Sequence, residues 1–163
     1  MPTYKGSWSV RRIVIAIIIF ASIAVVAFAR QQDQGVEVVL PAKVSKEDMS
    51  GSIFSRPDMV EMERYGTNTL DVVTLMSSDG KFASGVYKAG KHRAEYTAEE
   101  PYGVDEFLYM VEGKMTLTSA DETVQEIGTG DAVTIPREWA GAIDTDGFLQ
   151  LWVIYSEDGS GLE

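Results

Sequence analysis

The sequence has no cysteine and a single histidine, His92, among its 163 residues. Without cysteine there can be no disulfide, no thiol catalysis and no zinc site built on thiolates. With one imidazole, one copy of the chain cannot build a site that needs two or three histidines. Basic residues are also few, 14 against 25 acidic ones, which gives a net charge of −11. Because proteins bind nucleic acids mainly through Lys and Arg at the phosphates, we expect no nucleic-acid partner.

An apolar run near the N-terminus is the main targeting feature. Residues 13–29 are uncharged and follow Arg11 and Arg12, the arrangement of a signal sequence or a signal anchor. The run is just long enough to span a bilayer, and Ala-Phe-Ala at 27–29 offers a cleavage site. We therefore expect residues 1–29 to be a signal peptide or an uncleaved anchor that holds the chain to the membrane. Either interpretation leaves the N-terminus cytoplasmic and exports the remainder, which is periplasmic or extracellular and carries 11 bases and 25 acids.

The exported part divides by composition into three stretches. Residues 30–66 are polar and mixed, and we interpret them as a linker and an N-terminal extension. Within this extension, Val36–Leu40 is expected to be extended, and Asp58–Arg64 to form one or two helical turns. Residues 67–156 show strand patterns, and 157–163 form a polar tail expected to fray.

Short apolar segments separated by turn residues follow one another from residue 69 onward. Turns are expected at Ser77–Lys81, at Lys88–Lys91 and at Gly113-Lys114. Many short strands with almost no helix predict an all-β sandwich or barrel. The predicted strands are Thr69–Met76, Phe82–Lys88, His92–Tyr96, Glu106–Glu112, Met115–Ser119, Thr123–Ile127, Asp131–Ile135 and Phe148–Tyr155.

The predicted strand Glu106–Glu112 is apolar on both faces. Alternation places Glu106, Leu108, Met110 and Glu112 on one face, and Phe107, Tyr109 and Val111 on the other. We expect the first face to line the barrel. The second is too apolar to leave in water, so we expect a homodimer.

Two stretches of the barrel resemble a known family. Glu106 is followed after six residues by Gly113, and Gly130-Asp131 is followed after four residues by Pro136. This spacing resembles the two motifs of the cupins. The words DEFLYMVEGKMTLT and GTGDAVTIPREWAG resemble small cupins of the ureidoglycine-aminohydrolase and ethanolamine-utilisation types. The resemblance extends from residue 84 to 155 and implies a double-stranded β-helix, or jelly-roll, barrel preceded here by the N-terminal hydrophobic helix.

The sequence departs from the cupin pattern at the metal ligands. The resemblance implies two histidines shortly before Glu106, where this chain has Glu99-Glu100-Pro101-Tyr102, and a third after Pro136, where it has Gly141. The usual site of three histidines and one glutamate is therefore absent, and iron dioxygenase chemistry is not expected. No cofactor is expected, although a divalent metal remains possible, with Glu106 and His92 as its weak candidate ligands and Glu95 and Glu100 as further oxygen donors.

Glu106 and His92 are the candidate catalytic residues. A buried carboxylate acts as an acid or base or holds a polar ligand, unless it pairs with a structural Arg or Lys. His92 follows a turn between two basic residues and is either a site residue or simply exposed. The candidate ligand-binding residues are Glu106, Glu100, Tyr102, Leu108, Met110 and Trp139. Trp139 and Trp152, with Tyr102 and Tyr109, form either an aromatic cavity wall or part of the core and dimer packing.

Three functions are compatible with these features. The first is an exported or membrane-tethered module that binds a small polar metabolite without the usual metal site. The second is a hydrolase, lyase or isomerase of a small polar substrate that uses Glu106. The third is a structural dimeric scaffold.

Overall fold

The computed structural model describes residues 39–162, and the chain from Ala42 onward forms one compact unit. The hydrophobic helix expected at 13–29 and most of Val36–Leu40 lie outside the described residues. No helix within the described part is both long and apolar enough to cross a membrane. A short helix, α2 (Lys46–Met49), and a 3₁₀ turn, η1 (Ser52–Ser55), precede the sheet.

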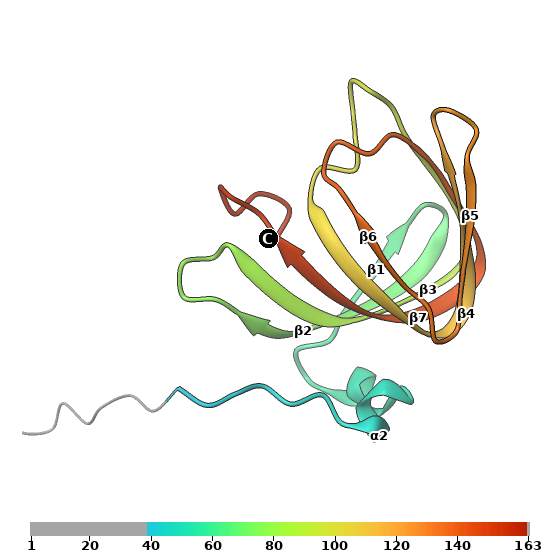
Figure 1. Ribbon diagram of the computed structural model, residues 1–163. Coiled ribbons are helices and arrows are strands. Elements are labelled where there is room, and N and C mark those ends of the chain that lie inside the picture. Colours follow the sequence, from blue (N-terminus) through green and yellow to red (C-terminus); the bar gives the residue numbers. More distant parts are fainter. Residues whose placement is uncertain (1–38, 163) are drawn as a thin grey trace, which may run out of the picture. The chain divides into compact units, whose positions relative to one another are not determined.

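Seven antiparallel strands make up a single sheet that curls into a barrel (Figure 1). Its hydrogen-bonded order is β1-β2-β3-β7-β4-β5, and β6 pairs with the first half of β4. The expected all-β jelly-roll barrel is thus confirmed. The strands are β1 (Val60–Arg64), β2 (Thr67–Met76), β3 (Phe82–Tyr96), β4 (Asp105–Ser119), β5 (Val124–Gly128), β6 (Ala132–Ile135) and β7 (Gly141–Tyr155).

The three longest strands, β3, β4 and β7, bend together at one row of glycines. Gly90 pairs with Gly147, and Gly147 pairs with Lys114 beside Gly113. Gly113 has a positive φ of 83°, and a Cβ on it would lie 2.2 Å from the Gly147 carbonyl oxygen. Only glycine allows two backbones to approach this closely at a positive φ. The pairing of β4 with β7 also shifts register on both sides of this position, as bulges do where a sheet turns.

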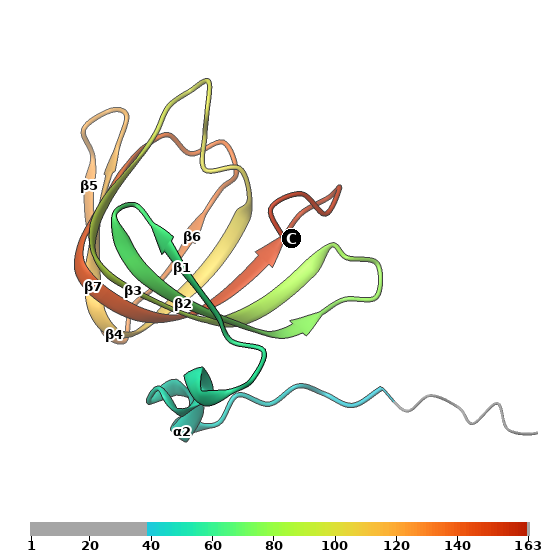
Figure 2. The same cartoon turned by 180° about the vertical axis from the view of Figure 1, so that it is seen from behind.

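Two apolar clusters stabilise the barrel from its two faces. The inner cluster extends to both sides of the glycine row and includes Leu108, Met110, Met115 and Phe148. The outer cluster covers the convex face, where Val72, Val86 and Leu149 lie under Ile53. Figure 2 shows α2 and η1 beneath this convex face. Because α2–η1 covers only one part of that face, apolar side chains of the neighbouring strands stay exposed, among them Phe82, Phe107, Tyr109 and Tyr155.

Several expected elements are corrected by the structure. Lys88–Lys91 and Gly113-Lys114 are bends inside continuous strands and not turns, because both strands stay paired to β7 on either side. The last strand begins at Gly141, seven residues before the expected start, because its first half pairs with β3 and β4.

The extension also differs from expectation. Asp58–Arg64 does not form helical turns: Val60–Arg64 is β1, which pairs with β2 from Val60↔Asp71 to Arg64↔Thr67. The helical turns lie earlier, in α2 and η1. In the tail, Asp158 accepts hydrogen bonds from Ser156 and Ser160, and these bonds lower its pKa to about 2. These bonds join the first residues of the tail to one another, and its fraying stays a prediction.

Candidate functional site

A cavity of about 630 Å³ lies inside the curl of the sheet. Its lining comes from the inward faces of β1, β2, β3, β4 and β7, from the loop before β4, and from the tail at Gly161 and Leu162. Alternation explains the lining, because Glu106 and Leu108 share the inward face of β4, as Gln150, Trp152 and Ile154 share that of β7. The cavity is of the size that small organic ligands occupy.

Glu106 is the most deeply buried charged group of this cavity, with 5% of its surface exposed. Its two hydrogen-bond donors are neutral. The Tyr102 hydroxyl donates to Oε2, and Gln150 Nε2 donates to Oε1 at 3.2 Å. No ion pair in the described part of the chain involves Glu106. The structural Arg or Lys partner considered as an alternative is therefore not there.

Burial sets the protonation of Glu106. Loss of hydration raises its pKa from 4.5 to about 7, the Tyr102 hydroxyl opposes this rise, and the charge of Asp71 adds to it. The carboxyl group therefore changes charge near neutral pH. The pKa of Tyr102 is raised well above 10, first by its own burial and then by the neighbouring Glu106 charge, so its hydroxyl stays a donor.

The loop before β4 holds Tyr102 in place. The Tyr102 N–H donates to the Trp139 carbonyl at 3.0 Å, and the next N–H, of Gly103, donates to the Arg137 carbonyl at 2.8 Å. The Trp139 ring lies edge-on to Tyr102, and its Nε1 donates to Ser119 Oγ at 3.0 Å. Trp139 thus positions Tyr102 from behind and does not line the cavity.

A chain of aromatic contacts joins His92 to Glu106 along the cavity wall. The His92 ring stacks on Tyr65 with centroids 5.2 Å apart, and the Tyr65 and Tyr96 hydroxyls lie 3.1 Å apart. Tyr96 then meets Tyr102 edge-to-face at 5.1 Å, and Tyr102 donates to Glu106. All five side chains line the same cavity.

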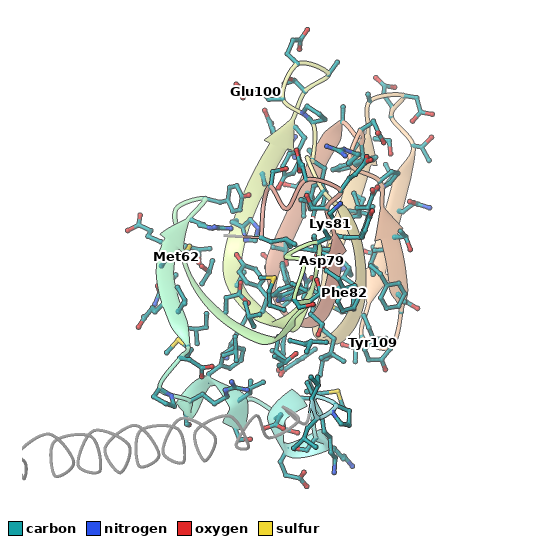
Figure 3. All side chains as sticks on the ribbon, turned by 90° about the vertical axis from the view of Figure 1, so that its left-hand side faces the viewer. Met62, Asp79, Lys81, Phe82, Glu100 and Tyr109 are labelled. Atoms are coloured by element: carbon teal, nitrogen blue, oxygen red, sulfur yellow. The ribbon has the colours of Figure 1, made fainter. Side chains whose placement is uncertain are left out.

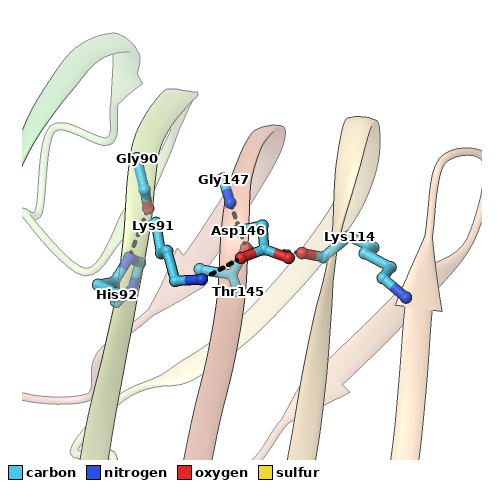
Figure 4. A network of polar contacts seen from close by, with 7 residues as sticks. All are labelled: Gly90, Lys91, His92, Lys114, Thr145, Asp146 and Gly147. Atoms are coloured by element: carbon cyan, nitrogen blue, oxygen red, sulfur yellow. Dashed lines mark hydrogen bonds and ion pairs between the residues drawn. The ribbon is translucent and has the colours of Figure 1, made fainter.

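His92 is held in one orientation by the backbone at the glycine row. Its Nδ1 donates to the Gly90 carbonyl at 2.9 Å (Figure 4). In the same network, Lys91 pairs with Asp146 at 2.7 Å, and the Thr145 hydroxyl donates to the Lys114 carbonyl at 2.6 Å. These contacts fix the bend that carries His92.

A second carboxylate, Asp71 on β2, also lines the cavity. Trp152 Nε1 donates to its Oδ1 at 3.1 Å, and burial raises its pKa. The Trp152 indole has room because Gly85 lies directly opposite on β3, where a Cβ would come within 2.4 Å of the ring. Gly85 therefore helps to place the indole that orients Asp71.

The structure brings together only part of the expected site. Glu106, Tyr102, Leu108 and His92 all line the cavity. Three other candidate residues do not. Met110 is fully buried in the inner cluster, Trp139 lies behind Tyr102, and Glu100 is exposed at the tip of its loop (Figure 3).

Several polar lining residues were not predicted, among them Asp71, Gln150, Tyr65 and Tyr96. Gln150 gave a usable indication, because it is a polar residue on the inward face of an apolar strand. Tyr65 has a positive φ of 54° between β1 and β2, a conformation not evident from its sequence. Asp71 reaches the site only through the pairing of β2 with β3, where it lies opposite Tyr87.

The donor set does not fit the metal site of three histidines and one glutamate. The described residues contain no group of three or more His, Asp or Glu side chains placed to hold a metal ion. Of the further oxygen donors considered, Glu95 is exposed and pairs with Arg93, and Glu100 is exposed on its loop. Gly141, where the third histidine was expected, has no side chain to offer, and a Cβ there would meet the Thr118 carbonyl at 2.3 Å.

Comparison with known families now identifies the domain. The family model of the EutQ-like cupin domain matches residues 77–149. This part of the chain is a small cupin domain of the EutQ-like type. The match covers β3, β4, β5 and β6 and the larger part of β7, so the cupin domain contains both Glu106 and His92.

Solved structures resemble this cupin barrel at low sequence identity. A protein of unknown function from Pseudomonas syringae pv. tomato has a TM-score of 0.53 and 10% identity over 59% of this chain and 43% of its own. A Rhizobium leguminosarum protein of unknown function has a TM-score of 0.49 and 19% identity over 73% of this chain and 100% of its own. The EutQ protein of Clostridium difficile has a TM-score of 0.45 and 15% identity over 71% of this chain and 82% of its own. No curated protein matches the chain.

Proposed function

We propose that this cupin domain binds a small organic molecule in its cavity, with Glu106 as the anchoring group and without the usual cupin metal site. One observation carries the proposal: a buried carboxylate lines a ligand-sized cavity and has only neutral partners. Burying a carboxyl group costs free energy, and a ligand that hydrogen-bonds to it offsets part of that cost. The apolar side chains around it, such as Leu108 and Phe148, suit the body of the ligand.

Retention of a small molecule tests this proposal. The purified full chain is incubated with a low-molecular-weight extract of its own cells, and native mass spectrometry then records what stays bound. We expect one bound organic species on the wild type and loss of most of it on Glu106→Gln. Glu100→Gln makes the same chemical change on the exposed loop and is expected to retain it. A stoichiometric divalent metal that disappears with Glu106→Gln, or no retained molecule at all, would overturn the proposal.

An enzymatic function is the second candidate, and the protonation of Glu106 favours it. A carboxyl group with a pKa of about 7 can both donate and accept a proton near neutral pH. A hydrolase, lyase or isomerase acting on a small polar substrate would use it in this way, with His92 in the same cavity as a second proton-transfer group. In the retention experiment, an enzyme would release a changed molecule from the wild type, while Glu106→Gln would hold the unchanged one.

We further propose that the barrel is exported, either tethered to the membrane or released, and that it forms a homodimer. The charge pattern before residues 13–29 supports export. The exposed apolar side chains Phe107 and Tyr109 on the convex face support a dimer, and a dimeric scaffold remains the third function considered.

A further inference from the structure

Two carboxylates share the cavity wall without a matching pair of cations. Asp71 and Glu106 both line it. They lie close enough together that the charge of Asp71 raises the pKa of Glu106. Neither takes part in an ion pair within the described residues. The cavity wall therefore carries two acids that no described cation pairs with, and a positive charge between the two carboxylates would be attracted by both.

Arg64 does not supply that charge. Its side chain lines the cavity from the end of β1, where the residue is exposed, and its charge acts on Asp71 from beyond ion-pair distance. Of the other charged groups in the lining, Asp58 already pairs with Arg56 at 2.6 Å. Among the described residues, Glu106 thus has no basic partner of its own.

An unpartnered acceptor lies next to Glu106. Gln150 is 5% exposed, and its Nε2 donates to Glu106 while its Oε1 has no hydrogen-bond partner. Most buried polar atoms in proteins are paired with protein or water, so this acceptor in the cavity wall is free to take a hydrogen bond that a ligand donates. Together, Asp71, Glu106 and Gln150 favour a ligand group that is positively charged and carries N–H donors.

The remaining wall is aromatic. Ring faces attract cations through their quadrupole, and this attraction grows when the site excludes water. The rings would also pack against the apolar body of the ligand. The aromatic lining residues are Tyr65, Tyr87, Tyr96, Tyr102, Phe148 and Trp152.

We propose that the cavity binds a protonated primary or secondary amine, with its ammonium group between Asp71 and Glu106 and one N–H donated to Gln150 Oε1. This rests on the proposed function, small-molecule binding at Glu106, and adds the chemical class of the ligand. A carboxylate or phosphate ligand is disfavoured by the same two acids, and an alcohol leaves their charge uncompensated.

Three benzene-ring probes of similar size test the proposal: benzylammonium, benzyl alcohol and benzoate. Each is titrated into the full chain at pH 8 by calorimetry. We expect benzylammonium to bind at least tenfold more tightly than benzyl alcohol, and benzoate not to bind. Asp71→Asn is expected to weaken benzylammonium about tenfold and to leave benzyl alcohol nearly unchanged. Asp121→Asn, the same change at an exposed turn, should alter neither.

The pH dependence provides a second readout on the unmodified chain. The groups that face Glu106 are Tyr102 before β4, Gln150 on β7, Asp71 on β2 and Tyr96 on β3. Because Glu106 ionises with a pKa of about 7, benzylammonium affinity should rise about tenfold between pH 6 and pH 8. His92 lines the same cavity, so the series is repeated in His92→Gln, which should keep the rise, and in Glu106→Gln, which should lose it.

The outcomes separate the amine proposal from the proposed function. Equal binding of benzyl alcohol and benzylammonium would overturn the amine proposal and leave small-molecule binding intact. Binding of benzoate, or of none of the three probes, would also overturn it, and the retained-molecule experiment would then decide the proposed function by itself. The preference among probes is measured on the wild type, so it remains decisive even if a variant fails to fold.

Discussion

Glu106 occupies a position where a charged carboxylate is costly and where neutral groups alone hydrogen-bond to it. In the folded chain its pKa is raised from 4.5 to about 7, mainly by burial. Between these two values, the folded protein keeps a proton that the unfolded chain has released. The stability that this proton contributes is complete at low pH and is lost as the pH rises through about 7.

This linkage predicts how Glu106→Gln changes stability. The shift in pKa corresponds to about 3 kcal/mol, most of which the wild type should lose between pH 5 and pH 8 and the variant should keep. Urea unfolding of both proteins at these two pH values measures the difference. At pH 8 the variant should be as stable as the wild type or more stable. A large loss of stability in Glu106→Gln at pH 8 would show that the carboxylate is a structural group after all.

Some site residues can be predicted from the sequence and others cannot, because the first depend on one strand and the second on how distant strands pair. Glu106 and Leu108 follow from alternation along one strand together with the spacing to Gly113. Asp71 and Gln150 lie on other strands, and their nearness to Glu106 depends on the register of β2, β3 and β7. Register is a long-range property that one strand's residues do not specify.

At the scale of elements, the same limit explains the continuous strands. Lys88–Lys91 and Gly113-Lys114 carry glycines that are typical of turns, yet each belongs to a strand that passes through a bend. Glycine is required at both kinds of position, and only the pairing with β7 distinguishes them. Four predicted strands therefore merged into two, while the location of strand residues was largely right.

The glycine row predicts a sharp contrast between two Gly→Ala variants. Both Gly113 and Gly130 have a positive φ, 83° and 92°, so alanine is strained at each. At Gly113 the new Cβ would also lie 2.2 Å from the Gly147 carbonyl oxygen, whereas at Gly130 nothing lies within 4 Å. We expect Gly113→Ala to cost several kcal/mol or to prevent folding, and Gly130→Ala to cost about 1–2 kcal/mol. Thermal or urea unfolding compares them, and equal losses would contradict this account of the bend.

At the scale of the whole molecule, the convex face of the barrel is covered only in part. The 3₁₀ turn η1 covers Val72, Val86 and Leu149, and beyond it Phe107 is 45% exposed and Tyr109 38% exposed. Register places Phe107 beside Val153 and Tyr109 beside Leu151, on the same face of the sheet. A second copy that meets this face through a two-fold axis would bury the same patch on both subunits.

Because the chain has no cysteine, single introduced thiols can test both export and dimerisation in cells. Val124 is 61% exposed on β5, which pairs with the second half of β4, away from Phe107. We expect Val124→Cys to react with a membrane-impermeant maleimide in spheroplasts, since export places it outside the cytoplasmic membrane. Protection of Val124→Cys until the membrane is lysed would contradict export.

Phe107→Cys should be joined into a covalent dimer by a short bismaleimide, and Val124→Cys should not. Equal crosslinking of the two variants, or none by Phe107→Cys, would contradict a dimer formed through the convex face. Neither result would bear on the cavity, because it opens on the other face of the sheet.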